Sequence, residues 1–134
     1  MVGILLITHG HFAEVLISTA EAIVGQIENI RAVSVSAEDD VETIKGIISG
    51  MMEEVDQGDG VIMLTDMFGG TPSNIGLSFL SHGEVEIITG VNLPILLKLA
   101  KERGGKTLPD LASLLKKRGR ESIVLASEML NGKS

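Results

Sequence analysis

A histidine and an aspartate stand at the ends of two apolar segments, in positions where side chains can do chemistry. His9 follows the apolar segment 4–8 and precedes Gly10, and Asp66 follows a second apolar segment, 61–65. In open α/β sheets, ligands and reactive groups collect at the carboxyl ends of the strands. A carboxylate that accepts a hydrogen bond from one imidazole nitrogen fixes the tautomer, and the other nitrogen is then a good nucleophile toward phosphorus. The pair therefore predicts nucleophilic chemistry at one edge of a sheet.

A glycine-rich turn follows Asp66 directly and offers a seat for an anion. The segment Phe68-Gly69-Gly70-Thr71-Pro72 combines a tight turn with Thr at a helix N-cap and Pro at the first helical position. Backbone N–H groups at such a helix start, with the Thr71 hydroxyl as an extra donor, favour a negatively charged group. The same residues also satisfy a plain helix cap without any ligand. Neither GxxxxGK[ST] nor GxGxxG occurs in the sequence, so the turn does not predict a bound nucleotide.

His11 gives the site two alternative interpretations. With His9 and Asp66, it could supply three ligands to the metal ion of a hydrolase. A histidine phosphatase is a further interpretation of His9, but that chemistry uses an arginine just before the histidine, where this chain has Thr8. His82 has the setting of a helix-end residue and adds nothing to a metal cluster. We place His11 at the rim of the site, where its ring can contact a partner.

Composition limits the class of protein. The 134 residues include no Cys, Trp or Tyr, carry a formal net charge of −7, and are 44% hydrophobic. The lack of cysteine excludes disulfides and thiolate chemistry. The negative charge and the shortage of aromatic rings exclude a nucleic-acid binder. The apolar segments are too short to span a bilayer, and no basic segment precedes the first one, so we expect a cytoplasmic protein without a signal peptide.

The rest of the chain alternates strand and helix patterns within a single domain, residues 1–134. Ser36 with Asp39 is expected to form a capping box, and Gly119 is expected to end the last helix. The predicted strands are 2–8, 30–35, 60–65, 85–89 and 122–126, and the predicted helices are 12–25, 41 to about 58, 71 to about 81, about 93–103 and 107–119.

Successive β-α-β units predict a three-layer α/β fold, with parallel strands, right-handed crossovers and helices on both faces of the sheet. If strand 2–8 is central, the strand order reverses between it and strand 60–65. His9 and Asp66 then flank the crevice at this switch point. The inference requires those two strands to be neighbours.

Three stretches of the sequence resemble the signature segments of one family, the mannose-type enzyme IIA domain of the bacterial phosphoenolpyruvate-dependent sugar phosphotransferase system. They are residues 8–14 (THGHFAE), 65–72 (TDMFGGTP) and 90–94 (GVNLP), in order and at the expected spacing, and residues 119–121 (GRE) resemble the family's entry into its last strand. The resemblance implies a mostly parallel four-stranded sheet in the order 2-1-3-4. It also implies a C-terminal edge strand, here 122–126, that can be exchanged in a homodimer.

The resemblance further implies a phosphocarrier with a covalent phosphohistidine intermediate and no cofactor. His9 would accept a phosphoryl group from HPr and pass it to a IIB component, and Asp66 would orient the imidazole so that Nε2 attacks. The phosphoryl-binding residues implied are Phe68, Gly69, Gly70 and Thr71.

A carrier has to release its phosphoryl group again, and the three signature segments contain no Lys or Arg that would clamp it. Partner docking is then expected on an apolar rim. The membrane would be reached only through IIC and IID components. A stand-alone domain of this kind can serve sugar uptake or act as a regulatory module read through the state of His9, and the residues leave both open. The candidate docking residues are His11, Phe12 and Met67, with Phe68 beside them.

Overall fold

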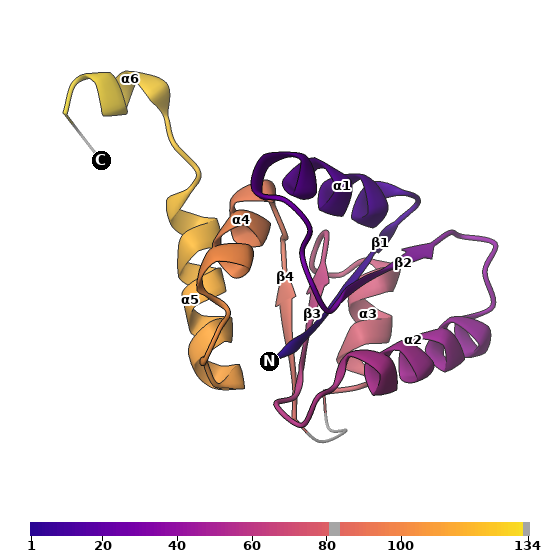
Figure 1. Ribbon diagram of the computed structural model, residues 1–134. Helices are drawn as coiled ribbons and strands as arrows, with labels where there is room; N and C mark the ends of the chain where they lie inside the picture. The colour runs from indigo at the N-terminus through magenta and orange to yellow at the C-terminus, as the bar shows by residue number, and fades with distance from the viewer. Residues whose placement is uncertain (81–83, 133–134) are drawn as a thin grey trace.

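Four parallel strands form the middle layer of the computed structural model, which describes residues 1–80 and 84–132 (Figure 1). In this part of the chain the sheet has the order β2-β1-β3-β4, which confirms the predicted order. Ile7 of β1 is in register with Thr65 of β3, so His9 and Asp66 come to the same edge of the sheet. The strands are β1 (Gly3–His9), β2 (Ile30–Val35), β3 (Val61–Thr65) and β4 (Val85–Thr89).

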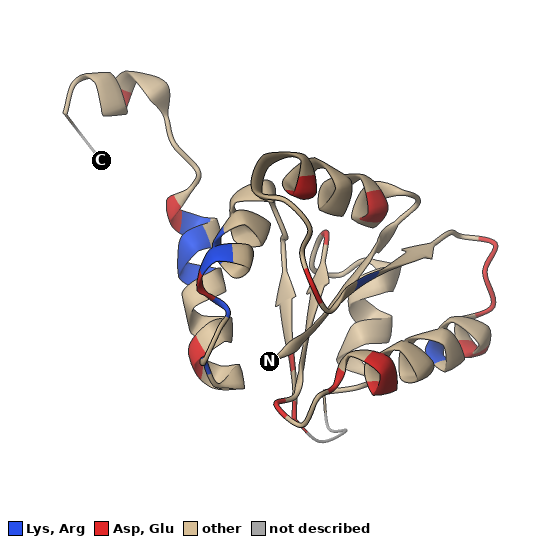
Figure 2. Cartoon of the chain, viewed as in Figure 1, with Lys and Arg blue, Asp and Glu red and all other residues tan. Residues whose placement is uncertain are grey.

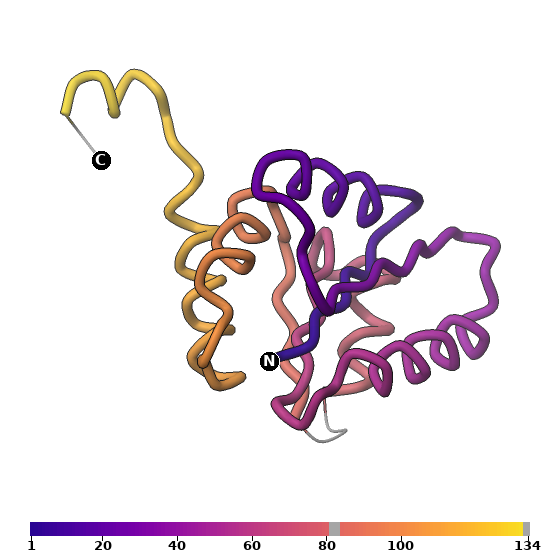
Figure 3. The backbone as a smooth tube through the Cα atoms, viewed as in Figure 1, coloured from indigo at the N-terminus to yellow at the C-terminus, as the bar shows by residue number. Residues whose placement is uncertain are grey.

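Helices cover both faces of the sheet, as the β-α-β pattern predicts. One face carries α1 (Phe12–Val24), α4 (Leu93–Glu102) and α5 (Leu108–Glu121), and the other carries α2 (Val41–Val55) and α3 (Thr71–Leu77). A short helix, α6 (Ala126–Leu130), follows α5 and projects away from the other elements (Figure 3). Within the described residues, no helix has the length and apolar character needed to cross a membrane.

The central strand β1 contributes to two separate cores, which explains its unbroken run of apolar residues. Ile4 and Leu6 pack in the core under α1, α4 and α5, whereas Leu5 and Ile7 pack in the core under α2 and α3. All four side chains are fully buried. Full burial of each such side chain stabilises the fold by about 1.5–3 kcal/mol. A parallel strand covered on both faces needs this pattern, and it fixes β1 in the middle of the sheet.

The predicted capping box forms a turn, but it does not start α2. The N–H of Ser36 donates to the carboxylate of Asp39 at 2.7 Å. The N-cap of α2 is instead Asp40, four residues beyond Ser36, and its carboxylate accepts the N–H of Thr43 at 3.2 Å. Asp39 therefore stabilises the turn, and its neighbour Asp40 caps the helix.

Two other helix ends differ from the prediction. Gly119 does not end α5 but lies inside it. Glycine is needed at this position because a Cβ would come within 2.6 Å of Cδ1 of Ile95 on α4. The glycine therefore serves the packing of two helices. Helix α3 ends at Leu77 instead of near residue 81. Ser81 and His82 lie outside the described residues.

The C-terminal strand predicted over residues 122–126 is not formed in the single chain. Ser122 closes α5, residues 123–125 belong to no strand, and α6 begins at Ala126. A strand needs a neighbour to complete its hydrogen bonds, and within the described chain no strand pairs with this segment. Its apolar side chains, Ile123, Val124 and Leu125, are exposed. Exchange of the segment in a dimer stays a prediction.

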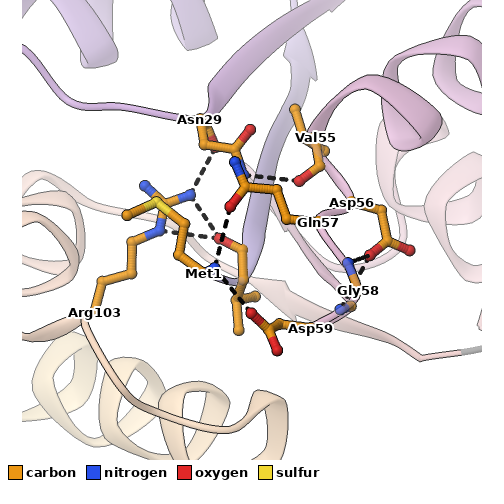
Figure 4. Close-up of polar contacts among 10 residues, drawn as sticks. Met1, Asn29, Val55, Asp56, Gln57, Gly58, Asp59 and Arg103 are labelled. Atoms are coloured by element: carbon orange, nitrogen blue, oxygen red, sulfur yellow. Dashed lines mark hydrogen bonds and ion pairs between the residues drawn. The ribbon is translucent and has the colours of Figure 1, made fainter.

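A buried arginine fastens the beginning of the chain at the amino edge of the sheet (Figure 4). Arg103, which caps the end of α4, is 5% exposed. Its guanidinium donates to the carbonyl oxygens of Val2 (3.0 Å from Nε and 2.6 Å from Nη2), Asn29 (2.7 Å) and Glu28. The planar fork of a guanidinium can serve several acceptors at once. This cluster holds the start of β1 at the edge opposite His9.

The Arg103→Lys variant is expected to lose about 2–4 kcal/mol of unfolding free energy, because a compact ammonium group lacks the planar fork that reaches the carbonyl groups of Val2, Glu28 and Asn29 together. Urea unfolding followed by circular dichroism measures the loss. The matched control is Arg118→Lys on the exposed face of α5, which should change stability by less than about 0.5 kcal/mol. Equal midpoints for the two variants would contradict the anchoring role of Arg103.

Candidate functional site

The structure brings His9 and Asp66 into direct contact at the carboxyl edge of the sheet. Nδ1 of His9 lies 2.7 Å from Oδ2 of Asp66, and the backbone N–H of His9 donates to the same oxygen at 3.0 Å. The other carboxylate oxygen accepts the N–H of Met67 at 3.0 Å. A carboxylate can only accept, so Nδ1 carries the proton and Nε2 of the neutral ring presents its lone pair. The adjacency of the two strands that this pair requires is confirmed.

Hydrogen bonding keeps the Asp66 carboxyl ionised. Burial acts to raise the pKa of Asp66, but the hydrogen bonds from the backbone and ring of His9, with the electrostatic attraction between the two side chains, outweigh burial and lower the pKa. The side chain of Asp66 is 16% exposed, whereas that of His9 is 51% exposed. An ionised carboxylate that is mostly covered thus supports an imidazole that solvent and partners can reach. This is how a protein orients a nucleophile.

The glycine-rich turn lies against the imidazole ring. Gly70, and not Thr71 as predicted, occupies the N-cap position of α3, and Pro72 is in its first turn. A Cβ on Gly70 would lie 2.9 Å from Cε1 and 3.4 Å from Nε2 of His9. The ring therefore needs the bare glycine beside it. Nε2 lies next to the start of α3, beside the residues expected to bind a phosphoryl group.

Thr8 is a positioning residue that the sequence analysis missed. Its side chain is fully buried, and its hydroxyl accepts the N–H of Ala13 at 2.8 Å. This bond caps the first turn of α1, because His11 at the N-cap makes no such bond with its own side chain. Gly10, between them, has a φ of 52°, which suits glycine. The sequence signal for this role was a hydroxyl residue at the end of the apolar segment. It was missed because Thr8 lies three residues before the N-cap position, His11, where a capping side chain is usually sought.

The residues predicted to dock partners follow His9 and Asp66 in the sequence and are exposed. Phe68 is 72% exposed, and Phe12 and Met67 are also exposed. The ring of His11 is exposed too and lies 3.7 Å from the carboxylate of Glu14. Large exposed apolar side chains beside a reactive group are typical of an interaction surface. Their role in docking stays a prediction.

The third signature segment, residues 90–94, is hydrogen-bonded to the end of β3, next to Asp66. The N–H groups of Gly90 and Val91 both donate to the carbonyl oxygen of Thr65, at 2.9 and 3.0 Å. Asn92 then caps α4 with its side chain. The segment therefore ties the end of β4 to the residue that precedes Asp66.

The described residues do not supply the ligand set of the hydrolase alternative. Among residues 1–80 and 84–132, no three His, Cys, Asp or Glu side chains gather in a way that could hold a metal ion. Asp66 is engaged with His9, and the ring of His11 faces Glu14. A metal-dependent hydrolase built on these residues therefore lacks support from the geometry.

Known proteins resemble this chain in sequence and in fold. A family profile described as "PTS system fructose IIA component" matches residues 3–116. The chain is 30% identical over 131 residues to the fructose-specific EIIA component of Bacillus subtilis (strain 168), covering 97% of this chain and 90% of that protein. It is 31% identical over 124 residues to the mannose-specific EIIAB component of Escherichia coli (strain K12), covering 91% of this chain but 38% of that protein.

A solved structure agrees with these matches. The PTS IIA protein associated with the fucose utilization operon of Streptococcus pneumoniae superposes with a TM-score of 0.81 at 30% identity, covering 96% of this chain and 95% of that chain. Fold and sequence together define a component of a sugar phosphotransferase system. The chain belongs to the mannose-family EIIA domains, as its three signature segments predicted.

The Asp66→Asn variant should be less stable than the wild type at pH 7, with the difference disappearing in acid. Because the folded pKa of Asp66 is lowered, its ionised form stabilises the fold above the usual pKa of the group. That contribution is lost as the pH falls below about 4 and through the folded pKa. Urea unfolding of both proteins between pH 7 and pH 3 measures it. Glu38→Gln, at an exposed carboxylate, is the control, and a pH-independent difference for Asp66→Asn would argue against the assignment.

Gly70→Ala should disturb the imidazole without unfolding the chain. The new Cβ would meet Cε1 of His9 and push the ring away from Asp66. We expect the ratio of the two neutral imidazole tautomers to shift about tenfold toward the Nε2–H form, roughly the loss of one hydrogen bond to a charged group. ¹⁵N NMR of the ring nitrogens reports the ratio. Gly104→Ala, where a Cβ has open space, should leave it unchanged, and an unchanged ratio in Gly70→Ala would contradict the contact.

Proposed function

We propose that this chain is a phosphocarrier: His9 accepts a phosphoryl group from HPr and passes it to a IIB component. The observation that carries the proposal is the 2.7 Å contact between Nδ1 of His9 and Oδ2 of Asp66. It leaves Nε2 as the free, accessible nitrogen of the ring. Membership of the EIIA family supports the nature of donor and acceptor.

Phosphoryl transfer between two histidines asks mainly for alignment. In the accepting step, the lone pair of Nε2 forms a bond to phosphorus while the nitrogen–phosphorus bond of phospho-HPr breaks in line with it. The attacking ring gains positive character, and the ionised carboxylate of Asp66 stabilises it through Nδ1–H. Onward transfer reverses these steps with the nitrogen of IIB as the attacking atom.

The residues at the start of α3 form the proposed binding site, or seat, of the phosphoryl group. A Cβ on Gly70 would lie 3.4 Å from Nε2, so backbone N–H groups near this residue are within reach of a group bound to that nitrogen. Dipoles of this kind stabilise the phosphoryl group without a full positive charge, and the signature segments contain no Lys or Arg. The group is then held loosely enough to leave. The proposed seat consists of Phe68, Gly69, Gly70 and the hydroxyl of Thr71.

Partner docking and assembly follow from the exposed apolar surface. The exposed side chains of His11, Phe12, Met67 and Phe68, which follow His9 and Asp66 in the sequence, are proposed to contact an apolar patch on HPr or IIB. The exposed segment 122–126 is proposed to exchange between two copies of the chain, with the outer edge of β4 as its pairing site. The carrier would act in the cytoplasm and reach the membrane through IIC and IID components. The sugar itself would not bind this chain.

The test is phosphorylation of the purified chain with phosphoenolpyruvate, enzyme I and HPr. Wild-type protein should acquire one acid-labile, base-stable phosphate. His9→Ala should lose the label completely, because among the described residues the only ring nitrogen that Asp66 orients belongs to His9. Thr19→Ala on the exposed face of α1 serves as a control that should label normally. Label persisting on another histidine in folded His9→Ala would refute the assignment.

A further inference from the structure

Asn92 joins the loop that follows β4 to the last turn of α5. Its side-chain Nδ2 donates to the carbonyl oxygen of Gly119 at 3.2 Å and to the hydroxyl oxygen of Ser122 at 3.3 Å. The Ser122 hydroxyl in turn donates to the same carbonyl oxygen of Gly119 at 2.8 Å. Residues far apart in the sequence thus form one hydrogen-bonded cluster near the carboxyl end of β4.

The same amide group also caps α4. Oδ1 of Asn92 accepts the N–H of Ile95 at 3.2 Å. Because a backbone N–H only donates and a backbone carbonyl only accepts, these partners fix which side-chain atom is oxygen and which is nitrogen. Serine and aspartate cap helices as well as asparagine does, but neither carries the two amide hydrogens that reach α5. The contact with α5 therefore goes beyond what a helix cap requires.

A close approach of α4 and α5 brings the amide within reach of its partners. A Cβ on Gly119 would lie 2.6 Å from Cδ1 of Ile95 and 3.9 Å from Nδ2 of Asn92. Gly119 is buried, and Asn92 and Ser122 are half-buried. Partial shielding from water strengthens hydrogen bonds of this kind. The end of α5 is therefore held in place against the start of α4.

The C-terminal segment leaves the domain directly after this cluster. Ser122 closes α5, and residues 123–125 belong to no helix or strand. The side chain of Ile123 is 81% exposed, and it borders a hollow of about 230 Å³ whose lining includes Asn92 and Ile88 of β4. Large exposed apolar side chains are typical of a surface that a partner covers. The position of Ser122 therefore sets the point from which the segment extends.

We propose that Asn92 is a positioning residue for the C-terminal segment: its amide fixes the direction in which the segment leaves α5 toward a second copy of the chain. This inference rests on the exchange of segment 122–126 proposed above. Association costs the conformational freedom of every residue that becomes ordered, and a segment already fixed at its first residue loses less. Asn92 thus strengthens the dimer without having to contact the second copy.

Two substitutions that keep the cap of α4 test this role. Asn92→Ser and Asn92→Asp retain a good capping residue and lose the donations to Gly119 and Ser122. Each should raise the dissociation constant of the dimer about tenfold, roughly the effect of one hydrogen bond on an equilibrium constant. Sedimentation equilibrium of the full chain measures it. Asp40→Ser, which introduces serine at the N-cap of α2, is the control and should change the constant by less than about twofold.

The comparison of the two variants identifies the cause. Serine is neutral and aspartate is charged, so equal effects assign the change to the lost amide hydrogens. Unchanged dissociation constants in both variants would mean that Asn92 is only a helix cap and would overturn the proposal. A rise confined to Asn92→Asp would point to charge repulsion and would overturn it as well.

The mobility of the segment separates this role from the exchange itself. The sequence contains no Cys, so a fluorophore attached to Ile123→Cys reports on one position. At a dilution where the chain is monomeric, the amplitude of the fast local anisotropy decay should be about twofold larger in Asn92→Ser than in the parent. Equal amplitudes would refute the fixing of the segment by Asn92. A wild-type chain that is monomeric at every concentration would refute the exchange instead, and neither measurement depends on phosphorylation of His9.

Discussion

A single hydrogen bond organises the carboxyl edge of this protein. Nδ1 of His9 and Oδ2 of Asp66 belong to residues 57 positions apart in the sequence, and they meet because β1 and β3 are neighbouring parallel strands. The same oxygen accepts the backbone N–H of His9, so one carboxylate fixes both the main chain and the ring. The tautomer of the ring and the direction in which Nε2 points both depend on this contact.

The surroundings of the pair hold the ring by close packing and short polar contacts. Thr8 secures the turn on the side of α1, and Gly70 allows α3 to approach the ring from the other side. Lys and Arg residues are concentrated on α4 and α5 (Figure 2), and the segments 8–14 and 65–72, which contain His9 and Asp66, include no Lys or Arg. A site without a fixed cation beside it suits a group that has to arrive and depart.

The amino and carboxyl ends of the parallel strands differ in what they contain. At the amino edge, Arg103 is buried among backbone carbonyl groups and secures the start of β1. At the carboxyl edge, the imidazole of His9 is half exposed, and the large apolar side chains that follow Asp66, including Phe68, are exposed as well. A rigid scaffold fixed at one end thus presents chemistry on loops at the other, which is the usual division in α/β folds.

The sequence by itself predicted most of the alternating elements and singled out His9 and Asp66 as a candidate pair, because hydrophobic periodicity and local turn chemistry act over short distances. The central place of the first strand was implied by the family resemblance and is confirmed by the sheet order. It misjudged Gly119, whose reason is the close approach of Ile95 from another helix, and the segment 122–126, whose strand pattern finds no partner within the described chain. Only the tertiary structure decided which groups touch the imidazole. Such contacts join residues distant in sequence, and no local pattern encodes the space between packed elements.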